Sequence, residues 1–360
     1  MKVVFAGGGT GGHIFPGIAV ARGLARLQSD VEVEFWGGGR PLEVDLFGRE
    51  EMPFRVLPAA PLPRNPIGVP KFLLSLASGY LKARRLLKKS GVSALVGLGG
   101  YSSFAPVLAA SRLGLATVLL EQNVIPGLAN RRLARRAGAV CLSWEASEEF
   151  LPPTARTEVT GNPVRENLVK AARVNRYDSG GALLILGGST GAVGLNSAVM
   201  EAAREAAALG RPVVHQAGRP DAERVKGAYA EAGVEAEVTP FISDMAGAYG
   251  RAALVVARAG GTTLAELALF GLPAVLVPYP HHKDRHQNAN AQVFAREGAG
   301  RIIEESEGPA VLLRVVRELL TAPVQLESMH AAALSLGRPE AADLVADIIL
   351  KLIETGGRAG

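Results

Sequence analysis

Five glycines and a histidine lie within residues 7–13, which read GGGTGGH between an apolar run and a helical pattern. Glycine lets the backbone approach a ligand closely, and the unpaired N–H groups at the start of the following helix favour phosphate. His13 begins that helix, where a neutral imidazole suits proton transfer near neutral pH. The same position suits a histidine that only bonds backbone or touches phosphate. We therefore predict a phosphate-binding loop, although the glycines could also serve only a tight turn. His13 could act as a catalytic base or as a binding residue, and the sequence does not decide between the two.

The glycine loop occurs a second time in the chain. Residues 5–12 read FAGGGTGG and residues 185–192 read ILGGSTGA. Each copy follows an apolar run of strand length and precedes a helical pattern. The repeat predicts two similar domains in tandem, each with a ligand-binding loop at the same place in a strand–loop–helix unit.

A dinucleotide-binding site is a weaker interpretation of the first loop. Gly7, Gly9 and Gly12 satisfy the pattern G-x-G-x-x-G. That site also needs an acid at the end of the second strand, and here the second run, VEVEFWGG, ends in Trp-Gly. We therefore expect no nicotinamide cofactor, and no other cofactor is predicted.

Strand-like apolar runs alternate with helical patterns along the whole chain, which predicts parallel sheets covered by helices on both faces. The fold class is therefore α/β, with two tandem doubly wound, Rossmann-like domains facing a cleft. The pattern breaks at GNPVR, residues 161–165, and we place a first domain at 1–161 and a second at 162–339. A last helix, within 340–360, has no strand after it and is expected to pack back onto the first domain. The predicted strands are KVVFA, VEVEFW, SALVGL, ATVLLE, AVCLS, ALLILG, PVVHQ, EVTPF, ALVVA and PAVLVP.

Composition restricts the class of protein. The single cysteine, Cys141, lies in the apolar stretch GAVCLS and is expected to be a buried, inert thiol. The N-terminus does not read as a signal peptide, and no apolar run approaches the roughly 18 residues of a spanning helix. The 360-residue chain is therefore expected to be soluble or peripheral.

Basic residues gather in the first half of the chain. Residues 1–161 carry 19 Lys and Arg against 12 Asp and Glu, whereas residues 162–360 carry 20 against 22. No acid occurs between Val56 and Leu120, and residues 70–89 combine six basic side chains with apolar residues near helical spacing. This segment, with RRLARR at 131–136, predicts contact with an anionic membrane surface, although a helix that only packs on its own sheet is the alternative. Nucleic acid is disfavoured because no aromatic residues interleave with the basic ones.

Seven motifs, taken in order, resemble the MurG family of glycosyltransferases. This family transfers N-acetylglucosamine from UDP-N-acetylglucosamine to a lipid-linked muramyl-pentapeptide. The resemblance implies the GT-B fold, with donor bound mainly by the second domain and acceptor by the first, in a peripheral enzyme at the cytoplasmic face of the cell membrane. The motifs are GGGTGGHIFPGIAVA, GLGGYSSFAPVLAA, LEQNVIPGLAN, GNPVR, LGGSTGAVGLN, FISDMAGAY and RAGGTTLAELALFGLPAVLVPYPHHKDRHQNANA.

The chain departs from the family pattern at three positions. Leu120 stands where the family often has His, Thr190 where Gln is usual, and His286 where the family often has Gln. None of these removes a charge that the reaction obviously needs. The contact made by His286 stays open.

The resemblance also implies roles for individual residues. Glu266 would accept hydrogen bonds from ribose hydroxyls, and Ile242 matches the position whose backbone reads uracil. Ser189 and Arg165 would bind phosphate, while Tyr101 is a weaker candidate for acceptor contact. Together with His13 as the catalytic candidate, the remaining predicted substrate contacts are Thr10, Gly11, Gly12, Asn123, Gly261, Thr262, Thr263, Leu264, Ala265, Gln287 and Asn290.

Other functions remain possible on sequence grounds. A transferase with another lipid acceptor, a UDP-sugar epimerase of the same fold, or a non-catalytic nucleotide-binding module would share the glycine loops. An epimerase would have no use for the basic, apolar face of the first domain. His281, His282 and His286 invite a metal interpretation, which we disfavour because no Asp-x-Asp pair accompanies them.

Overall fold

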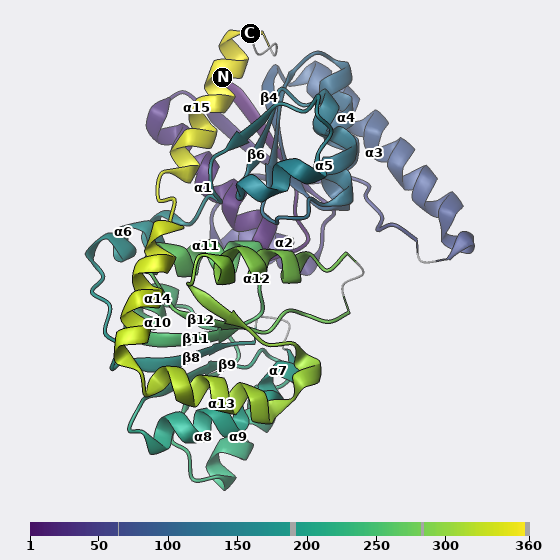
Figure 1. Cartoon of the computed structure of the whole chain (residues 1–360). Coiled ribbons are helices and arrows are strands. Elements are labelled where there is room, and N and C mark those ends of the chain that lie inside the picture. The colour runs from purple at the N-terminus through teal and green to yellow at the C-terminus, as the bar shows by residue number, and fades with distance from the viewer. Residues whose placement is uncertain (64, 188–191, 282–283, 357–360) are drawn as a thin grey trace. The chain divides into compact units, whose positions relative to one another are not determined.

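The computed structural model describes residues 1–63, 65–187, 192–281 and 284–356 (Figure 1). The chain divides into two compact units, Met1–Arg165 with Pro339–Gly360, and Glu166–Arg338. The division falls at the end of GNPVR, slightly later than the sequence suggested.

A parallel sheet forms the centre of the first unit. Within its described residues, seven strands lie in the order β3-β2-β1-β4-β5-β6-β7. Neighbouring strands are parallel throughout, and the first six follow the order of doubly wound folds. The predicted fold class is thereby confirmed for this unit. The strands are β1 Lys2–Gly7, β2 Glu32–Gly37, β3 Phe54–Val56, β4 Val92–Gly99, β5 Ala116–Glu121, β6 Ala139–Leu142 and β7 Thr157–Val159.

Helices cover both faces of this sheet because alternate strand residues face opposite sides. Val3 and Phe5 pack with α1 and α15, whereas Val4 and Ala6 pack with α3, α4 and α5. Cys141 is fully enclosed in the first of these two cores, and burial raises the pKa of its thiol, in keeping with an inert residue. The helices are α1 Gly11–Leu27, α2 Pro41–Arg49, α3 Val69–Lys89, α4 Tyr101–Arg112, α5 Leu128–Leu133 and α15 Ala341–Glu354.

The C-terminal helix α15 belongs to the first unit although it follows the whole second unit in sequence. Its apolar residues Val345 and Ile349 are completely buried beside α1. Arg26 on α1 forms an ion pair with Asp343 at 2.5 Å. A Cβ on Gly23 would lie 3.1 Å from the Ala342 carbonyl oxygen, so the small residue lets the two helices approach closely.

The second unit repeats the same sheet order. Its described strands lie in the order β10-β9-β8-β11-β12-β13, again all parallel. This agreement confirms the prediction of two similar doubly wound units. The strands are β8 Ala182–Leu186, β9 Val213–Gln216, β10 Glu237–Thr239, β11 Ala252–Ala257, β12 Ala274–Leu276 and β13 Gly300–Ile302. The helices are α6 Glu166–Val174, α7 Val193–Ala198, α8 Met200–Ala208, α9 Ala222–Glu231, α10 Met245–Arg251, α11 Gly261–Phe270, α12 His286–Arg296, α13 Pro309–Leu320 and α14 Pro323–Ser335.

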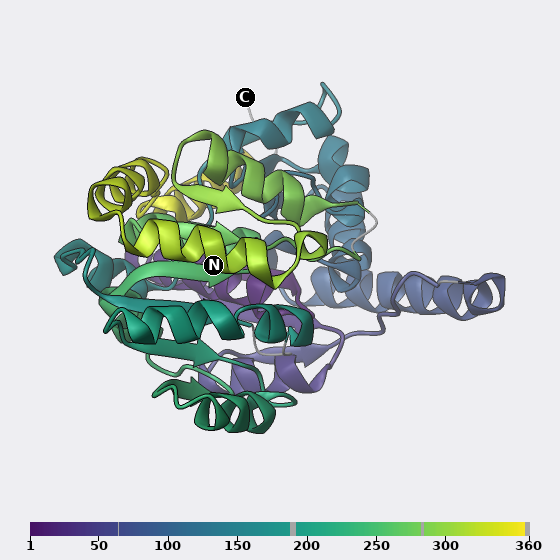
Figure 2. The same ribbon diagram turned by 60° about the horizontal axis from the view of Figure 1, so that its bottom comes forward.

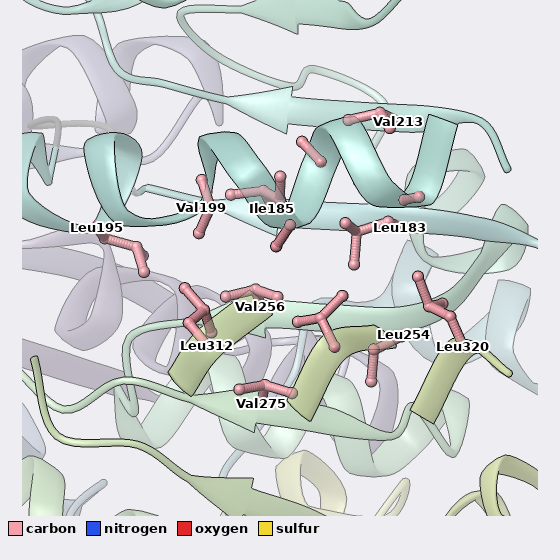
Figure 3. Packing of buried hydrophobic residues seen from close by; sticks show 14 of the residues in the cluster. Leu183, Ile185, Leu195, Val199, Val213, Leu254, Val256, Val275, Leu312 and Leu320 are labelled. Carbon is pink, nitrogen blue, oxygen red and sulfur yellow. The ribbon is translucent and has the colours of Figure 1, made fainter. Parts of the chain in front are cut away.

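The core of the second unit lies between its sheet and the helices α8 and α13. Figure 3 shows Leu183 and Ile185 of β8 and Leu254 and Val256 of β11 directed toward these helices. All four side chains are completely buried. Their spacing by two residues is the reason that one face of each strand reaches this core.

Three details differ from the sequence-based expectations. The short strands β3, β7 and β13 were not predicted, because each has a charged residue at its centre (FRV, TEV and GRI) and forms no apolar run. The run EVTPF ends as a strand at Thr239. Pro16 follows the glycine loop closely, and a proline there suits the first turn of a helix; in the structure it lies further inside α1, because the helix already begins at Gly11.

Helix α3 extends beyond the other elements of its unit, as both views show (Figures 1 and 2). Its buried residues are Gly79, Ala83 and Leu87, all in the C-terminal half. Leu73 and Leu74 in the N-terminal half are 55% and 72% exposed. Of the described helices, none is both long and apolar enough to cross a membrane.

Candidate active site

The topology of each sheet places one ligand-binding edge. In a doubly wound sheet, ligands bind beyond the carboxyl ends of the two central strands whose connections diverge. In the first unit these strands are β1 and β4, which pair with Gly7 opposite Gly99. In the second unit they are β8 and β11. The glycine-rich motifs found in the sequence follow these four strands.

His13 lies in the first turn of α1, with its ring half-buried at this edge. Its Nδ1 is 2.9 Å from the Thr10 hydroxyl. If Nδ1 carries the proton and donates to Thr10, Nε2 is the basic nitrogen of the neutral ring. The Thr10 contact therefore provides a means of setting the tautomer that a base requires.

Gly99 allows the His13 ring to lie against the end of β4. A Cβ at this position would be 3.0 Å from Cδ2 and 3.2 Å from Nε2 of His13. The Gly99 φ of +92° is also a conformation that L side chains rarely adopt. Gly7 serves the same purpose on β1, where a Cβ would lie 2.7 Å from the Gly99 carbonyl oxygen. The two loops meet because neither carries a side chain there.

Tyr101 begins α4 at the same edge, directly after the β4 loop. Its hydroxyl accepts a hydrogen bond from Arg40 Nε at 3.0 Å, and the Arg40 guanidinium carbon lies 5.2 Å from the ring centroid. Arg40 Nη1 also donates to the Gly9 carbonyl at 3.4 Å. The sequence analysis did not single out Arg40; its signal is a basic residue in the loop that follows the second strand.

Asn123 belongs to a loop organised by the buried carboxylate of Glu121, which the sequence analysis also missed. Glu121 accepts hydrogen bonds from the backbone N–H groups of Asn123 at 3.0 Å and Gly127 at 2.9 Å, and from Asn130 Nδ2 at 2.9 Å. Burial raises the pKa of Glu121 in spite of these donors. The side-chain amide of Asn123 also donates to Glu121 at 3.4 Å. Glu121 thus fixes the shape of the loop in which Asn123 was predicted to meet the sugar.

Arg165 closes the first unit, as the last residue of GNPVR. Its guanidinium carbon lies 4.4 Å from the ring centroid of Phe15 on α1. Gly11 and Gly12 form the start of the same helix and are only half-buried. These contacts keep a basic side chain beside the helix that carries His13.

Glu266 lies on α11, and its carboxylate is buried. The hydroxyl of Tyr249 donates to its Oε2 at 2.7 Å. Tyr249 belongs to α10, which begins where the Asp244 carboxylate accepts a hydrogen bond from the Gly247 N–H at 2.9 Å. The motif FISDMAGAY therefore caps a short helix and positions the tyrosine that orients Glu266. Sequence reasoning found the motif but not this role.

The start of α11 presents Thr262 and Thr263, which are half-buried, after the buried Gly261. Leu264 is completely buried, and its N–H donates to the Gly260 carbonyl at 3.0 Å. Ala265 is buried as well. The N–H groups of the first turn are thus the ones whose position suits phosphate, while ligand contact by Leu264 and Ala265 stays a prediction.

Three residues around the start of α12 hold the neighbouring loops. Asn290 is completely buried and donates to the Ala259 carbonyl at 3.0 Å, which supports the RAGG loop rather than presenting an exposed amide. The Gln287 side-chain oxygen accepts from the Tyr279 N–H at 2.9 Å. His286 Nδ1 lies 2.7 Å from Asp284 Oδ1, just before the helix begins.

Arg258 is a further positioning residue that the sequence analysis missed. It donates to the carbonyls of Val277 at 3.1 Å and Pro278 at 3.2 Å, and it pairs with Glu305 at 2.6 Å. The arginine thereby joins the ends of β11 and β12 to the segment after β13. Its place in the RAGG motif was the available signal.

The structure says little about the remaining predicted residues. Ile242 is a buried loop residue beyond the end of β10. Ser189, with Gly188, Thr190 and Gly191, lies outside the described residues, as does His282. In the part of the chain that the structure describes, no group of three or more His, Cys, Asp or Glu side chains is arranged to hold a metal ion.

Comparison with known proteins identifies the family. Residues 3–142 match the glycosyltransferase family 28 N-terminal domain, and residues 182–345 match its C-terminal domain. Relatives from Myxococcus xanthus and Syntrophotalea carbinolica are 38% and 40% identical. The alignments cover 100% of this chain and 95% of the first relative, and 96% of this chain and 97% of the second. Both relatives are named UDP-N-acetylglucosamine–N-acetylmuramyl-(pentapeptide) pyrophosphoryl-undecaprenol N-acetylglucosamine transferase.

Solved structures agree with this result. MurG of Acinetobacter baumannii superposes with a TM-score of 0.78 at 31% identity, covering 97% of this chain and 99% of that one. A UDP-N-acetylglucosamine 2-epimerase from Listeria monocytogenes superposes with a TM-score of 0.68 at 15% identity, covering 100% of this chain and 98% of that one. At this low identity the likeness shows only a shared fold. The architecture is therefore GT-B, as the resemblance implied. The chain belongs to glycosyltransferase family 28 and, within it, to the MurG family of N-acetylglucosamine transferases.

Proposed function

We propose that the chain transfers N-acetylglucosamine from UDP-N-acetylglucosamine to a lipid-linked muramyl-pentapeptide, in the step that produces the lipid-linked disaccharide of peptidoglycan synthesis. A hydroxyl of the acceptor sugar attacks the anomeric carbon of the donor, its proton passes to a base, and UDP leaves with inversion. The observation that carries the proposal is the oriented carboxylate of Glu266 on the helix that follows the β11 glycine loop, in a chain whose full-length relatives are named for this reaction.

The second unit binds the donor in this proposal. Glu266, held by Tyr249, accepts hydrogen bonds from the ribose hydroxyls, and the backbone at Ile242 reads uracil. The first-turn N–H groups of α11, at Gly261, Thr262 and Thr263, meet the diphosphate and stabilise the charge that grows as UDP leaves. Phosphate contacts of Ser189 and Arg165 and sugar contacts of Gln287 belong to the same proposal.

The first unit activates and positions the acceptor. Nε2 of His13 takes the proton of the attacking hydroxyl, provided that Nδ1 donates to Thr10 as the 2.9 Å contact permits. Tyr101 and the loop of Asn123 contact the acceptor beside it. The backbone of Gly11 and Gly12 completes this edge.

Metal is not required in this proposal. A helix N-terminus supplies positive charge at the diphosphate that other transferases obtain from a cation. The predicted diphosphate contacts, which are N–H groups of α11 with Ser189 and Arg165, are all protein groups.

The decisive experiment uses labelled UDP-N-acetylglucosamine with a lipid-linked muramyl-pentapeptide. The expected product is the lipid-linked disaccharide, formed together with UDP. Conversion of the UDP-sugar in the absence of any acceptor, without disaccharide in its presence, would favour an epimerase and overturn the proposal. Transfer to a different lipid acceptor in preference to the muramyl-peptide would overturn its acceptor assignment.

We also propose that α3 attaches the enzyme to the cytoplasmic face of the membrane. Its basic residues are all exposed, and the exposed leucines Leu73, Leu74 and Leu81 accompany them. Each Lys or Arg near an anionic leaflet contributes about 1 kcal/mol, which salt screens, while burial of the leucines is insensitive to salt. The basic residues of this surface are Lys71, Lys82, Arg84, Arg85, Lys88 and Lys89.

Co-sedimentation with vesicles tests this attachment. The wild-type protein should bind vesicles rich in anionic lipid, bind neutral vesicles much less, and bind more weakly as salt increases. Reversal of Arg84, Arg85, Lys88 and Lys89 to Glu should abolish binding. A matched variant reverses four exposed basic residues of the second unit and should still bind; these are Arg173, Lys226, Arg296 and Arg314. Equal binding by both variants would assign α3 to ordinary packing.

A further inference from the structure

Arg40 is a fixed positive charge at the ligand-binding edge of the first unit. Its side chain is exposed, and no carboxylate forms an ion pair with it among the residues that the structure describes. Its partners are the neutral Tyr101 hydroxyl, the Tyr101 ring and the Gly9 carbonyl. A guanidinium keeps its charge at any physiological pH, so within the described residues this charge stays without an ion pair.

The backbone at Arg40 is held as firmly as its side chain. The buried carboxylate of Glu43 accepts hydrogen bonds from the N–H groups of Gly39 at 2.7 Å and Arg40 at 3.0 Å. Pro41 follows immediately and fixes the first turn of α2. An arginine held in this way loses little conformational freedom when it binds an anion, which favours tight binding.

The position of the guanidinium relates it to the reacting groups. Gly9, whose carbonyl it contacts, directly precedes Thr10, the partner of His13. The His13 ring packs against Gly99 at the end of β4, and Tyr101 begins the helix that follows this strand. The charge therefore lies at the edge where this topology binds ligands, and it contacts the loop that leads to the candidate base.

We propose that Arg40 binds the diphosphate that links the acceptor sugar to its lipid, and so is a further substrate-binding residue of the transfer reaction. The inference rests on the proposed function. Both substrates carry a diphosphate, but the donor diphosphate has its predicted contacts at α11 in the second unit. The acceptor diphosphate is attached to the sugar whose hydroxyl must reach His13, so an anion-binding group beside the His13 loop suits the acceptor. The planar fork of arginine matches phosphate oxygens in pairs.

Steady-state kinetics of Arg40→Gln test the proposal, with a short-chain, water-soluble lipid-diphosphate muramyl-pentapeptide as acceptor. The KM for this acceptor should rise roughly tenfold or more, the effect of removing a charged hydrogen-bonding partner. The Kd for UDP-N-acetylglucosamine, measured by calorimetry, should stay within about twofold of wild type. Arg49→Gln is the matched control: it removes the same charge at the other end of α2, where Arg49 pairs with Asp45 at 3.0 Å, and it should change neither value.

A second readout measures the diphosphate site without the sugar. Geranyl diphosphate should inhibit the wild-type enzyme in competition with the acceptor, and Arg40→Gln should raise its Ki about as much as it raises the acceptor KM. Arg40→Lys keeps the charge but loses the fork, and it should restore part of both affinities. This lysine variant also replaces the glutamine variant in all assays if the latter proves unstable on thermal melting.

Several outcomes would overturn the proposal. A weakened donor Kd with an unchanged acceptor KM would assign Arg40 to the donor diphosphate. No inhibition by geranyl diphosphate, or equal behaviour of the lysine and glutamine variants, would reduce Arg40 to a support for Tyr101. Absence of disaccharide formation by the wild-type enzyme is a separate result, because it contradicts the proposed function and not the role of Arg40 within it.

Discussion

The substitution Gly99→Ala tests whether the reaction depends on the position of the His13 ring, separately from any loss of stability. The new Cβ would lie 3.0 Å from Cδ2 and 3.2 Å from Nε2 of His13, closer than normal contact, so the imidazole must shift by a few tenths of an ångström. The φ of Gly99 is +92°, which adds a backbone cost of roughly 1–2 kcal/mol for any L side chain. The substitution therefore strains the backbone and displaces the candidate base at once.

Gly114→Ala is the matched control for the backbone cost. Gly114 has a φ of +73°, and a Cβ there would meet no atom within 4 Å. Both variants should melt a few degrees below wild type, since a loss of 1 kcal/mol corresponds to roughly 2–4 °C in a chain of this class. Only Gly99→Ala displaces His13, so only this variant should lose substantial activity.

The assay is the steady-state rate of disaccharide formation at saturating substrates, with thermal melting and UDP affinity measured in parallel. We expect kcat of Gly99→Ala to fall roughly tenfold to a hundredfold, because misplacement by about 1 Å costs about a hundredfold in well-aligned sites. Gly114→Ala should stay within about twofold of wild type. Unchanged kcat in Gly99→Ala would refute the dependence of the reaction on the position of His13, and an equal loss in both variants would attribute the effect to backbone strain.

Three further predictions concern the donor site, pH and metal. Glu266→Gln should weaken UDP-N-acetylglucosamine by roughly 1.5–3 kcal/mol in calorimetry, and Glu266→Ala should in addition lower the melting temperature, because the buried Tyr249 hydroxyl loses its acceptor; unchanged affinity would remove the ribose role. Burial lowers the pKa of His215 to about 4, and the unfolded chain takes up a proton near pH 6.5, so this stabilisation is complete above pH 6.5 and is lost as the pH falls towards 4. Between pH 7 and pH 5 the wild type should lose about 2 kcal/mol more unfolding free energy than His215→Gln in matched denaturant titrations, and parallel pH profiles would contradict this. Activity should persist in excess chelator, and complete loss that magnesium or manganese reverses would overturn metal independence.

Much of the fold could be predicted because its strands are buried on both faces. The runs that became β1, β4, β5, β8 and β11 are continuous and apolar, which is typical of strands at the centre of a parallel sheet. The missed strands β3, β7 and β13 each have three residues and lie at the edges of their sheets. Each of the three has a charged residue at its centre, so it lacks the apolar run by which the other strands were recognised.

The candidate site was predictable in its residue types but not in its supports. Glycine loops and polar residues at strand ends indicated where a ligand would bind. The residues that hold them act through partners remote in sequence: Tyr249 reaches Glu266 across 17 positions, and Asn290 reaches Ala259 across 31. Glu121, buried at the end of β5, binds Gly127 in the following loop and Asn130 in α5, nine positions away. Only the folded chain brings such pairs together, so their spacing along the chain does not reveal them.

The two units show how one topology serves two different chemical tasks. Both carry a glycine loop after the first central strand and a second loop after the fourth strand of the sheet, and in both a polar side chain packs where a glycine leaves room. In the first unit that side chain is His13 beside Gly99; in the second it is Asn196, whose Oδ1 would lie 2.5 Å from a Cβ on Gly187. Asn196 donates to Asp221 and the Ala217 carbonyl, so it braces loops and is not placed to move a proton.

The acidic residue of the second unit completes this contrast. A dinucleotide-binding fold reads ribose with an acid at the end of its second strand. Here the candidate ribose-binding acid, Glu266, lies instead on the helix after β11, where Tyr249 orients it. In the first unit the corresponding helix, α4, begins with Tyr101 beside the charge of Arg40. The equivalent helices therefore differ in the charge beside them: α11 carries the carboxylate of Glu266 itself, whereas α4 meets, through Tyr101, the guanidinium of Arg40 from the loop after β2. These charges match the proposed contacts, a sugar hydroxyl in one unit and an anion in the other.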